Sequence, residues 1–147
     1  MRPNQLIVKC FLFLLFTLTM QSAFAQKADD ILGVWLSGSK KGHIQIYKTG
    51  DKYYGKLIWI KEPNENGKPK LDKNNSDPKK RTLPLLGIVN LNNFVFDDDE
   101  WTDGTIYDPE NGKTYSCTIT LEDGKLHVRG YIGISLIGRT DVWERVK

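Results

Sequence analysis

The feature that most constrains the fold is a strict alternation of apolar and polar side chains in the last third of the chain. Lys113–Leu121 places tyrosine, cysteine, isoleucine and leucine on one face and threonine and serine on the other. Asp123-Gly124 follows, a dipeptide typical of a tight hairpin turn, and Leu126–Ile132 alternates again. Successive side chains of a strand point to opposite faces, so this segment predicts an antiparallel hairpin with one buried face.

Other segments have the same character, with short apolar runs separated by Gly, Ser and Asp turns. They are Gly33–Leu36, His43–Tyr47, Tyr53–Ile60, Phe94–Phe96, Thr105–Tyr107 and Leu136–Val146. No segment keeps a helical period, and the best helix candidate is a single turn around Leu85–Leu91, which Gly87 weakens. Strands at this spacing predict an all-β, antiparallel sandwich or barrel. A closed barrel of about eight strands also removes exposed strand edges.

The N-terminus has the three regions of a secretory signal peptide. Arg2 precedes the apolar run Leu6–Thr19, and Ala23-Phe24-Ala25 offers small residues at the cleavage positions. The apolar run is shorter than the roughly 20 residues that a spanning helix needs. We therefore expect residues 1–25 to be removed, residues 26–147 to form one domain, and no transmembrane segment to remain.

Charge and cysteine content argue against nucleic-acid binding and against an internal disulfide. The formal net charge is +3, and two of the cations, Arg2 and Lys9, lie in the expected signal peptide. The rest is therefore nearly neutral, which gives no indication of nucleic-acid binding. Cys117 is the one cysteine beyond that segment, so an internal disulfide is not expected. Its phase within an alternating strand predicts a buried, inert thiol.

One segment, Glu62–Leu83, is different in kind. It is rich in Lys, Asn, Asp and Pro and has no apolar periodicity. A loop of this length within a small domain is usually functional or mobile. We interpret it as a long surface excursion between strands.

The sequence offers no recognisable catalytic or metal centre. His43 and His127 sit in alternating strands, out of phase with the aliphatic residues, and no cluster has metal-ligand spacing. The acidic turn Asp97–Glu100 lacks the oxygen ligands and flanking helices of a calcium-binding loop. We therefore predict no catalytic residue, no metal and no cofactor.

Arginines and aromatic residues are the stronger candidates for ligand contact. The candidate ligand-binding residues are Tyr54, Arg81, Trp101, Tyr107, Tyr115, Arg129 and Arg139. An arginine that points into a barrel needs a partner, and plausible partners are Asp72, Asp108 and Asp141. Such pairs would either lock the barrel or anchor an anionic ligand head. The phase of Arg129 opposes that of Leu126 and Val128, which favours an outward side chain.

A series of short motifs then appears in order through the chain. They are Gly33-x-Trp35, Tyr54-Gly55-Lys56-Leu57, Asp72-x-x-Asn75 with Asp77-Pro78, Arg81-x-x-Pro84-Leu85-Leu86-Gly87, Trp101-x-x-Gly104-x-Ile106-Tyr107-Asp108-Pro109, Gly112-Lys113-x-Tyr115, Leu126-x-Val128-Arg129-Gly130-Tyr131 and Gly138-Arg139-Thr140-x-x-Trp143-x-Arg145. With these motifs the chain resembles the bacterial family called domain of unknown function 2147. Ser76 departs from the pattern, which usually has proline there. The resemblance implies an exported bacterial protein, periplasmic or secreted, with a calycin-like, lipocalin-type up-and-down barrel.

A wider resemblance, to lipocalins, concerns the first strand. Lipocalins begin with Gly-x-Trp, and an arginine near the closing strand packs across that tryptophan. Here Gly33 and Trp35 would take the first part, and Arg139 or Arg145 the second. We assign structural roles to Gly33, Trp35 and Arg145, because a guanidinium can stack on an indole and bind nearby carbonyls.

Three functional hypotheses follow. The first is an exported barrel that binds a small, partly apolar or lipid-like ligand. The second is an envelope protein-interaction or accessory module with a filled barrel, which would use the Glu62–Leu83 loop and the Asp97–Asp103 turn. The third, which the sequence favours least, is an enzyme on an envelope substrate.

Overall fold

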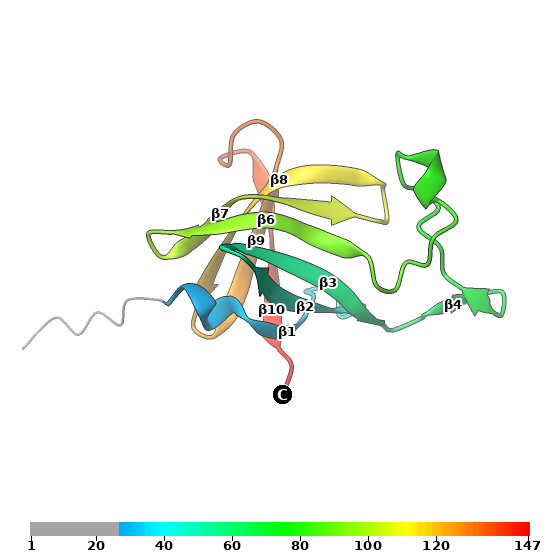
Figure 1. Cartoon of the computed structure of the whole chain (residues 1–147), viewed down its shortest axis with the longest axis horizontal. Coiled ribbons are helices and arrows are strands. Elements are labelled where there is room, and N and C mark those ends of the chain that lie inside the picture. The colour runs from blue at the N-terminus through cyan, green and yellow to red at the C-terminus, as the bar shows by residue number, and fades with distance from the viewer. Residues whose placement is uncertain (1–26) are drawn as a thin grey trace, which may run out of the picture.

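Eight strands close into a barrel within residues 27–147, the part of the chain that the computed structural model describes (Figure 1). The strands are β1 (Gly33–Leu36), β2 (Gly42–Thr49), β3 (Lys52–Ile60), β6 (Val89–Asp97), β7 (Glu100–Asp108), β8 (Lys113–Glu122), β9 (Lys125–Tyr131) and β10 (Gly138–Arg145). Their order around the barrel is β1-β10-β9-β8-β7-β6-β3-β2, and every pair is antiparallel. The predicted antiparallel barrel is thus confirmed. The expected signal peptide, residues 1–25, lies outside the described residues.

Some predicted elements were wrong in position or length. The helical turn expected around Leu85–Leu91 is absent, because Val89–Asp97 is a strand. Helical turns occur instead at η1 (Ala28–Ile31) and η2 (Pro78–Lys80). Strands β6 and β7 extend well beyond the short candidates Phe94–Phe96 and Thr105–Tyr107.

The sequence predicted these two strands too short because their pairing is irregular. The register shifts where β3 pairs with β6 and between Trp101 and Gly104 of β7. Asn93 and Asp103 have positive φ angles of 63° and 57° at these irregular points. A bulge puts an extra residue on one strand, so the period-two pattern breaks and the strand is hard to see in the sequence.

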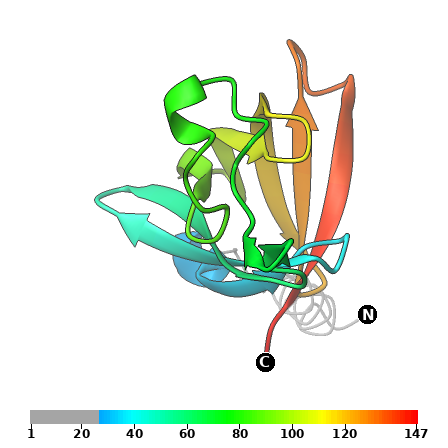
Figure 2. The same ribbon diagram turned by 90° about the vertical axis from the view of Figure 1, so that its right-hand side faces the viewer.

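The antiparallel order gives the barrel two distinct ends. We call the end with η1 and the turns at 50–51, 98–99 and 123–124 the lower end. The upper end has the connections 37–41, 61–88, 109–112 and 132–137. The longest of these, 61–88, also includes the small hairpin of β4 (Asn64–Glu65) and β5 (Lys68–Pro69). Figure 2 shows this loop in green beside the barrel strands.

Large side chains fill the interior toward the lower end. Trp35 and Trp101 are fully buried, and Tyr53, Phe94 and Trp143 are at most 2% exposed. A glycine makes room for one of these rings, because a Cβ on Gly104 would lie only 2.4 Å from the ring of Phe94. The lower part of the interior is therefore packed by aromatic rings, which interdigitate as in other protein cores.

The chain before β1 closes the lower end. Ile31 of η1 is 1% exposed, and the indole of Trp35 donates a hydrogen bond to its carbonyl at 2.8 Å. The indole of Trp101 donates to the carbonyl of Ala28 at 3.0 Å. Two buried tryptophans thus hold η1 as a plug across the barrel, and both buried indole N–H groups have partners.

Arg145 at the end of β10 secures this plug. Its guanidinium lies over the ring of Trp35, 4.1 Å from the ring centroid. It also donates hydrogen bonds to the carbonyls of Leu32 at 2.8 Å and Asp30 at 2.7 Å. A Cβ on Gly33 would lie 2.6 Å from the guanidinium, and the φ of +128° suits glycine. The three residues assigned structural roles from the sequence therefore meet at one point.

Cys117 lies in the middle of the barrel wall with its side chain inside. The residue is fully buried, and burial raises the pKa of its thiol to about 12. A thiol in this state carries almost no thiolate at neutral pH, so the native protein has a buried, unreactive cysteine.

The Arg145 contacts give a direct prediction about stability. We expect Arg145→Lys to lower the free energy of unfolding by about 1–2 kcal/mol, because lysine keeps the charge but loses the planar fork and the stacking. Arg139→Lys is the matched control on the same strand and should leave stability unchanged. Urea unfolding followed by tryptophan fluorescence measures both, and equal stability of the two variants would contradict the assigned role.

Candidate functional site

Side chains that face the barrel interior become more exposed toward the upper end. The lower layer of Trp35, Trp101 and Trp143 is at most 2% exposed. Higher in the barrel Leu57 is 8% exposed, and Ile106 is only half-buried. Inward-facing side chains are thus buried below and more exposed above, which makes the upper half the candidate site.

Three neighbouring strands contribute the wall of this upper half. Cys117 and Ile119 are buried, so Tyr115, two residues earlier on β8, has the same inward phase. A Cβ on Gly130 of β9 would lie 3.5 Å from Ile106 and 3.6 Å from Tyr115. The Tyr115 hydroxyl accepts a hydrogen bond from the Asn111 amide at 2.9 Å. The wall is therefore apolar, with one phenol tied to the upper rim.

Strand β10 adds two charged groups to the same inward face. Arg139 pairs with Gly130, and Asp141 pairs with Val128, so both share the inward phase of those residues. Asp141 accepts hydrogen bonds from the Trp143 indole at 2.7 Å and from the Gly38 backbone N–H at 3.1 Å. Its carboxylate is thereby engaged. The Arg139 guanidinium makes no hydrogen bond or ion pair with any other residue in the described part of the chain.

Asn90 is a polar group that the sequence did not indicate. It is the extra residue where Gly55 pairs with Leu91 and Lys56 pairs with Val89. The side chain is only 9% exposed, and its Oδ1 accepts no hydrogen bond within residues 27–147. A buried acceptor without a partner destabilises a fold by about 1–3 kcal/mol. Bulges often redirect a side chain for function, and Asn90 lies near the upper end of β6.

The long loop is built around one buried carboxylate. Asp72 is 4% exposed and accepts hydrogen bonds from the Tyr107 hydroxyl at 2.6 Å and the Asn75 amide at 2.7 Å. Burial and the adjacent carboxylate raise the pKa of Tyr107 well above its usual range. The Arg81 Nε donates to the Asn75 carbonyl at 2.7 Å. The predicted Glu62–Leu83 excursion is therefore an ordered segment fastened to strand β7.

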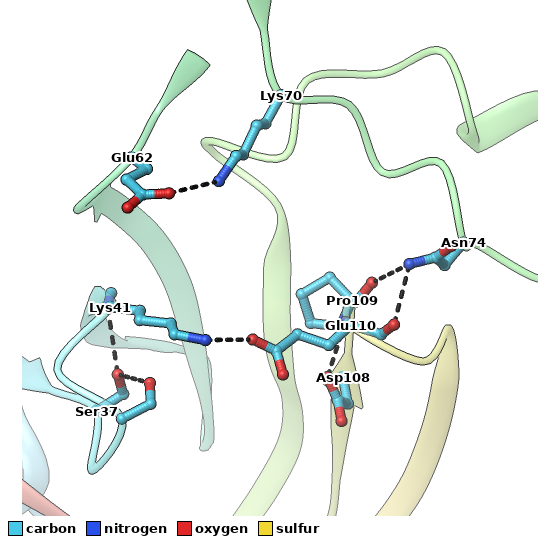
Figure 3. Close-up of polar contacts among 10 residues, drawn as sticks. Ser37, Lys41, Glu62, Lys70, Asn74, Asp108, Pro109 and Glu110 are labelled. Atoms are coloured by element: carbon cyan, nitrogen blue, oxygen red, sulfur yellow. Dashed lines mark hydrogen bonds and ion pairs between the residues drawn. The ribbon is translucent and has the colours of Figure 1, made fainter. Parts of the chain in front are cut away.

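The same loop is fastened to the turn between β7 and β8 (Figure 3). The Asn74 amide donates to the carbonyls of Pro109 and Glu110 at 3.1 and 3.0 Å. Lys41, in the connection between β1 and β2, forms an ion pair with Glu110 at 3.2 Å. These two connections come from opposite sides of the barrel order, so the pair bridges the upper rim. Both side chains are largely exposed, so dissolved salt screens this bridge.

The structure brings together only part of the candidate set from the sequence. Tyr115 and Arg139 both have the inward phase of their strands at the upper end, where Tyr115 is half-buried and Arg139 is exposed. Tyr107 and Arg81 hold the long loop, and Trp101 holds η1 at the opposite end. Their partners explain these residues without a ligand.

Two further candidates lie on the outside of the barrel. The Tyr54 hydroxyl donates to the Asn93 amide oxygen at 3.0 Å. Arg129 faces outward, as its phase predicts, and donates to the carbonyls of Ser135 and Leu136. The aspartate partner that an inward arginine would need therefore does not apply to Arg129, whose partners are loop carbonyls and the Thr140 hydroxyl.

Groups that could do acid–base or metal chemistry are dispersed. Within residues 27–147 no group of three or more His, Cys, Asp or Glu side chains is placed to hold a metal ion. The ring of His43 lies against Trp59 at 4.4 Å, and the Nε2 of His127 lies 3.9 Å from a Glu122 carboxylate. Residues 27–147 also contain no helix with the length and apolarity needed to cross a bilayer.

A closed barrel of eight antiparallel strands is the architecture of the lipocalin-like fold. More particularly, the chain belongs to the family of uncharacterized proteins conserved in bacteria known as DUF2147, whose model matches residues 33–145. Among solved structures, protein HP1028 from Helicobacter pylori, described as belonging to the lipocalin family, is similar with a TM-score of 0.69. The two share 22% sequence identity over 80% of this chain and 83% of that chain. No curated protein matches the sequence.

Gly112 allows a direct test of how the long loop is fastened. A Cβ there would lie 1.8 Å from the Asn74 carbonyl oxygen, whereas a Cβ on Gly124 meets nothing within 4 Å. Their φ angles are nearly equal, at +72° and +73°. We expect Gly124→Ala to lower stability by about 1 kcal/mol through backbone strain alone. Gly112→Ala should lower it further and expose the loop to trypsin.

Urea unfolding and limited proteolysis distinguish the two variants. Equal loss of stability, with equal resistance of residues 61–88 to trypsin, would show that the Asn74 contact does not hold the loop.

Proposed function

We propose that this protein binds a small amphiphile, with an apolar body and an anionic head, in the upper half of its barrel. The observation that carries the proposal is the gradient of exposure inside the barrel, from sealed tryptophans below to the half-buried Ile106 and Tyr115 above. Ligand sites in small barrels are concave and apolar, with a few placed polar groups. The lipocalin-type fold is consistent with such a site.

Two polar groups would orient the ligand. Arg139 shares the inward face and has no acidic partner among residues 27–147, so its guanidinium can pair with a carboxylate or phosphate. Asn90 Oδ1 is buried without a donor in the same part of the chain, so a hydroxyl or amide on the ligand would satisfy it.

We further propose that the protein acts outside the cytoplasm, in the periplasm or after secretion. Support comes from the charged start, short apolar run and Ala23-Phe24-Ala25 site at the N-terminus. Sequencing the N-terminus of protein from a bacterial periplasmic extract tests this. A chain that begins near Gln26 agrees, and full-length protein confined to the cytoplasm would contradict it.

A dansyl-labelled undecanoic acid is a suitable probe for the barrel, because its emission increases and shifts to the blue in an apolar site. We expect Arg139→Gln to weaken its binding about tenfold or more, since a charge-assisted hydrogen bond is lost. Lys147→Gln, which removes one cation near the lower end, is the control and should bind like the wild type. Absence of probe binding by the wild type would favour the filled-barrel interaction module.

A substitution at Asn90 distinguishes a role in ligand binding from a role in stability. We expect Asn90→Leu to be as stable as the wild type or more stable, because a buried unsatisfied acceptor is replaced by an apolar group of similar size. The same variant should bind probes that carry a hydroxyl or amide donor less tightly. Strong destabilisation, measured by urea unfolding, would show that the amide oxygen has a partner within the fold.

A further inference from the structure

The loop between β9 and β10 exposes an unusual concentration of aliphatic side chains. Ile132, Ile134, Leu136 and Ile137 are exposed by 73%, 59%, 83% and 72%. Single exposed aliphatic residues are normal, but several adjacent ones on a soluble domain mark a surface that contacts something apolar. We call residues 132–137 the apolar loop.

The fold holds the apolar loop in this exposed arrangement. Arg129 donates to the Ser135 carbonyl at 2.7 Å, the Leu136 carbonyl at 3.2 Å and the Thr140 hydroxyl at 3.0 Å. The Ile137 N–H donates to the Ile134 carbonyl at 3.2 Å, which closes a turn. The guanidinium therefore binds the loop backbone from outside the barrel wall, and the aliphatic side chains are left facing solvent.

A basic segment of the long loop lies on the same side of the molecule as the apolar loop. In both views the green segment with η2 and the orange-red apolar loop rise toward the top of the picture (Figures 1 and 2). η2 and the residue that follows it provide Lys79, Lys80 and Arg81, none with an acidic partner among the described residues. A rim with exposed aliphatic residues and free cations complements a surface that is apolar inside and anionic outside.

None of the acids of the long loop forms an ion pair with the side chains of these cations. Glu62 pairs with Lys70 and Glu65 with Lys73, at 3.6 and 2.9 Å. Asp72 is buried against Tyr107, and Asp77 accepts a hydrogen bond from the Lys79 backbone N–H. The acidic run Asp97–Glu100 lies at the opposite, lower end of the barrel.

We infer that the upper rim docks on an anionic lipid bilayer, with the apolar loop inserted among the lipids and Lys79 and Lys80 at the headgroups. The composition of the loop favours lipid over protein. Protein interfaces are enriched in Tyr, Trp and Arg at their centres and bury about 1,000 Å² or more, whereas this loop is small and wholly aliphatic apart from glycine and serine. Docking in this orientation would turn the barrel opening toward the membrane.

Binding to vesicles tests the inference. Purified protein is mixed with vesicles of phosphatidylcholine, with and without phosphatidylglycerol, and the bound fraction is measured by flotation. We expect binding that increases with phosphatidylglycerol content. Leu136→Ser combined with Ile137→Thr should weaken the partition at least about tenfold. Lys79→Gln combined with Lys80→Gln should weaken it about fivefold per lysine on anionic vesicles.

Matched controls remove similar groups elsewhere. Ile58→Thr with Val142→Thr changes two exposed aliphatic residues of the barrel wall, and Lys52→Gln with Lys147→Gln changes two cations near the lower end. Both controls should bind like the wild type. A retained N-terminal apolar segment would itself bind vesicles, so all variants are compared after their N-termini have been sequenced and found identical. Thermal unfolding verifies that each variant is folded.

Two outcomes would overturn the inference. One is vesicle binding that the loop and lysine variants leave unchanged. The other is self-association of the wild type in the absence of lipid, abolished by the loop variant, because this would assign the apolar loop to a second copy of the chain. The proposed barrel site is tested separately, since the loop variant should still bind the dansyl fatty acid.

Discussion

The contact between Arg145 and Trp35 closes the barrel and decides which end can be open. Strand β1 is short and pairs with β10 only at Trp35 and Leu36, so backbone hydrogen bonds alone make a weak seam there. The Arg145 guanidinium adds side-chain contacts to this seam. It stacks on the Trp35 indole and donates hydrogen bonds to two carbonyls of the chain that precedes β1. The plug η1, the first strand and the last strand are thereby joined at one point.

Sealing the lower end has consequences for the rest of the molecule. The tryptophans, with Tyr53 and Phe94, fill the interior there. The upper rim is correspondingly the more elaborate end, since it has the long loop built on Asp72, the bridge from Lys41 to Glu110 and the apolar loop. The lower end of this barrel is thus packed and structural, and the upper end has the loops that are available for contacts.

The sequence predicted the regular parts of this structure well and the irregular parts poorly. Clean alternation identified the β8–β9 hairpin, and Gly-x-Trp with a late arginine pointed to the contact that Arg145 makes. Strands β6 and β7 were underestimated because bulges near Asn93 and Asp103 interrupt the period of two. The phase of Arg129 predicted its outward direction. No local pattern could show that Tyr107 would meet Asp72 of the long loop, because that contact joins residues distant in the chain.

Native mass spectrometry of the protein recovered from a bacterial periplasm without detergent tests the central claim most directly, namely that the upper half of the barrel accepts a small amphiphile. We predict a discrete added mass that disappears after extraction with organic solvent. A bare chain mass that persists after incubation with an envelope lipid extract would contradict the claim and identify the barrel as a filled scaffold.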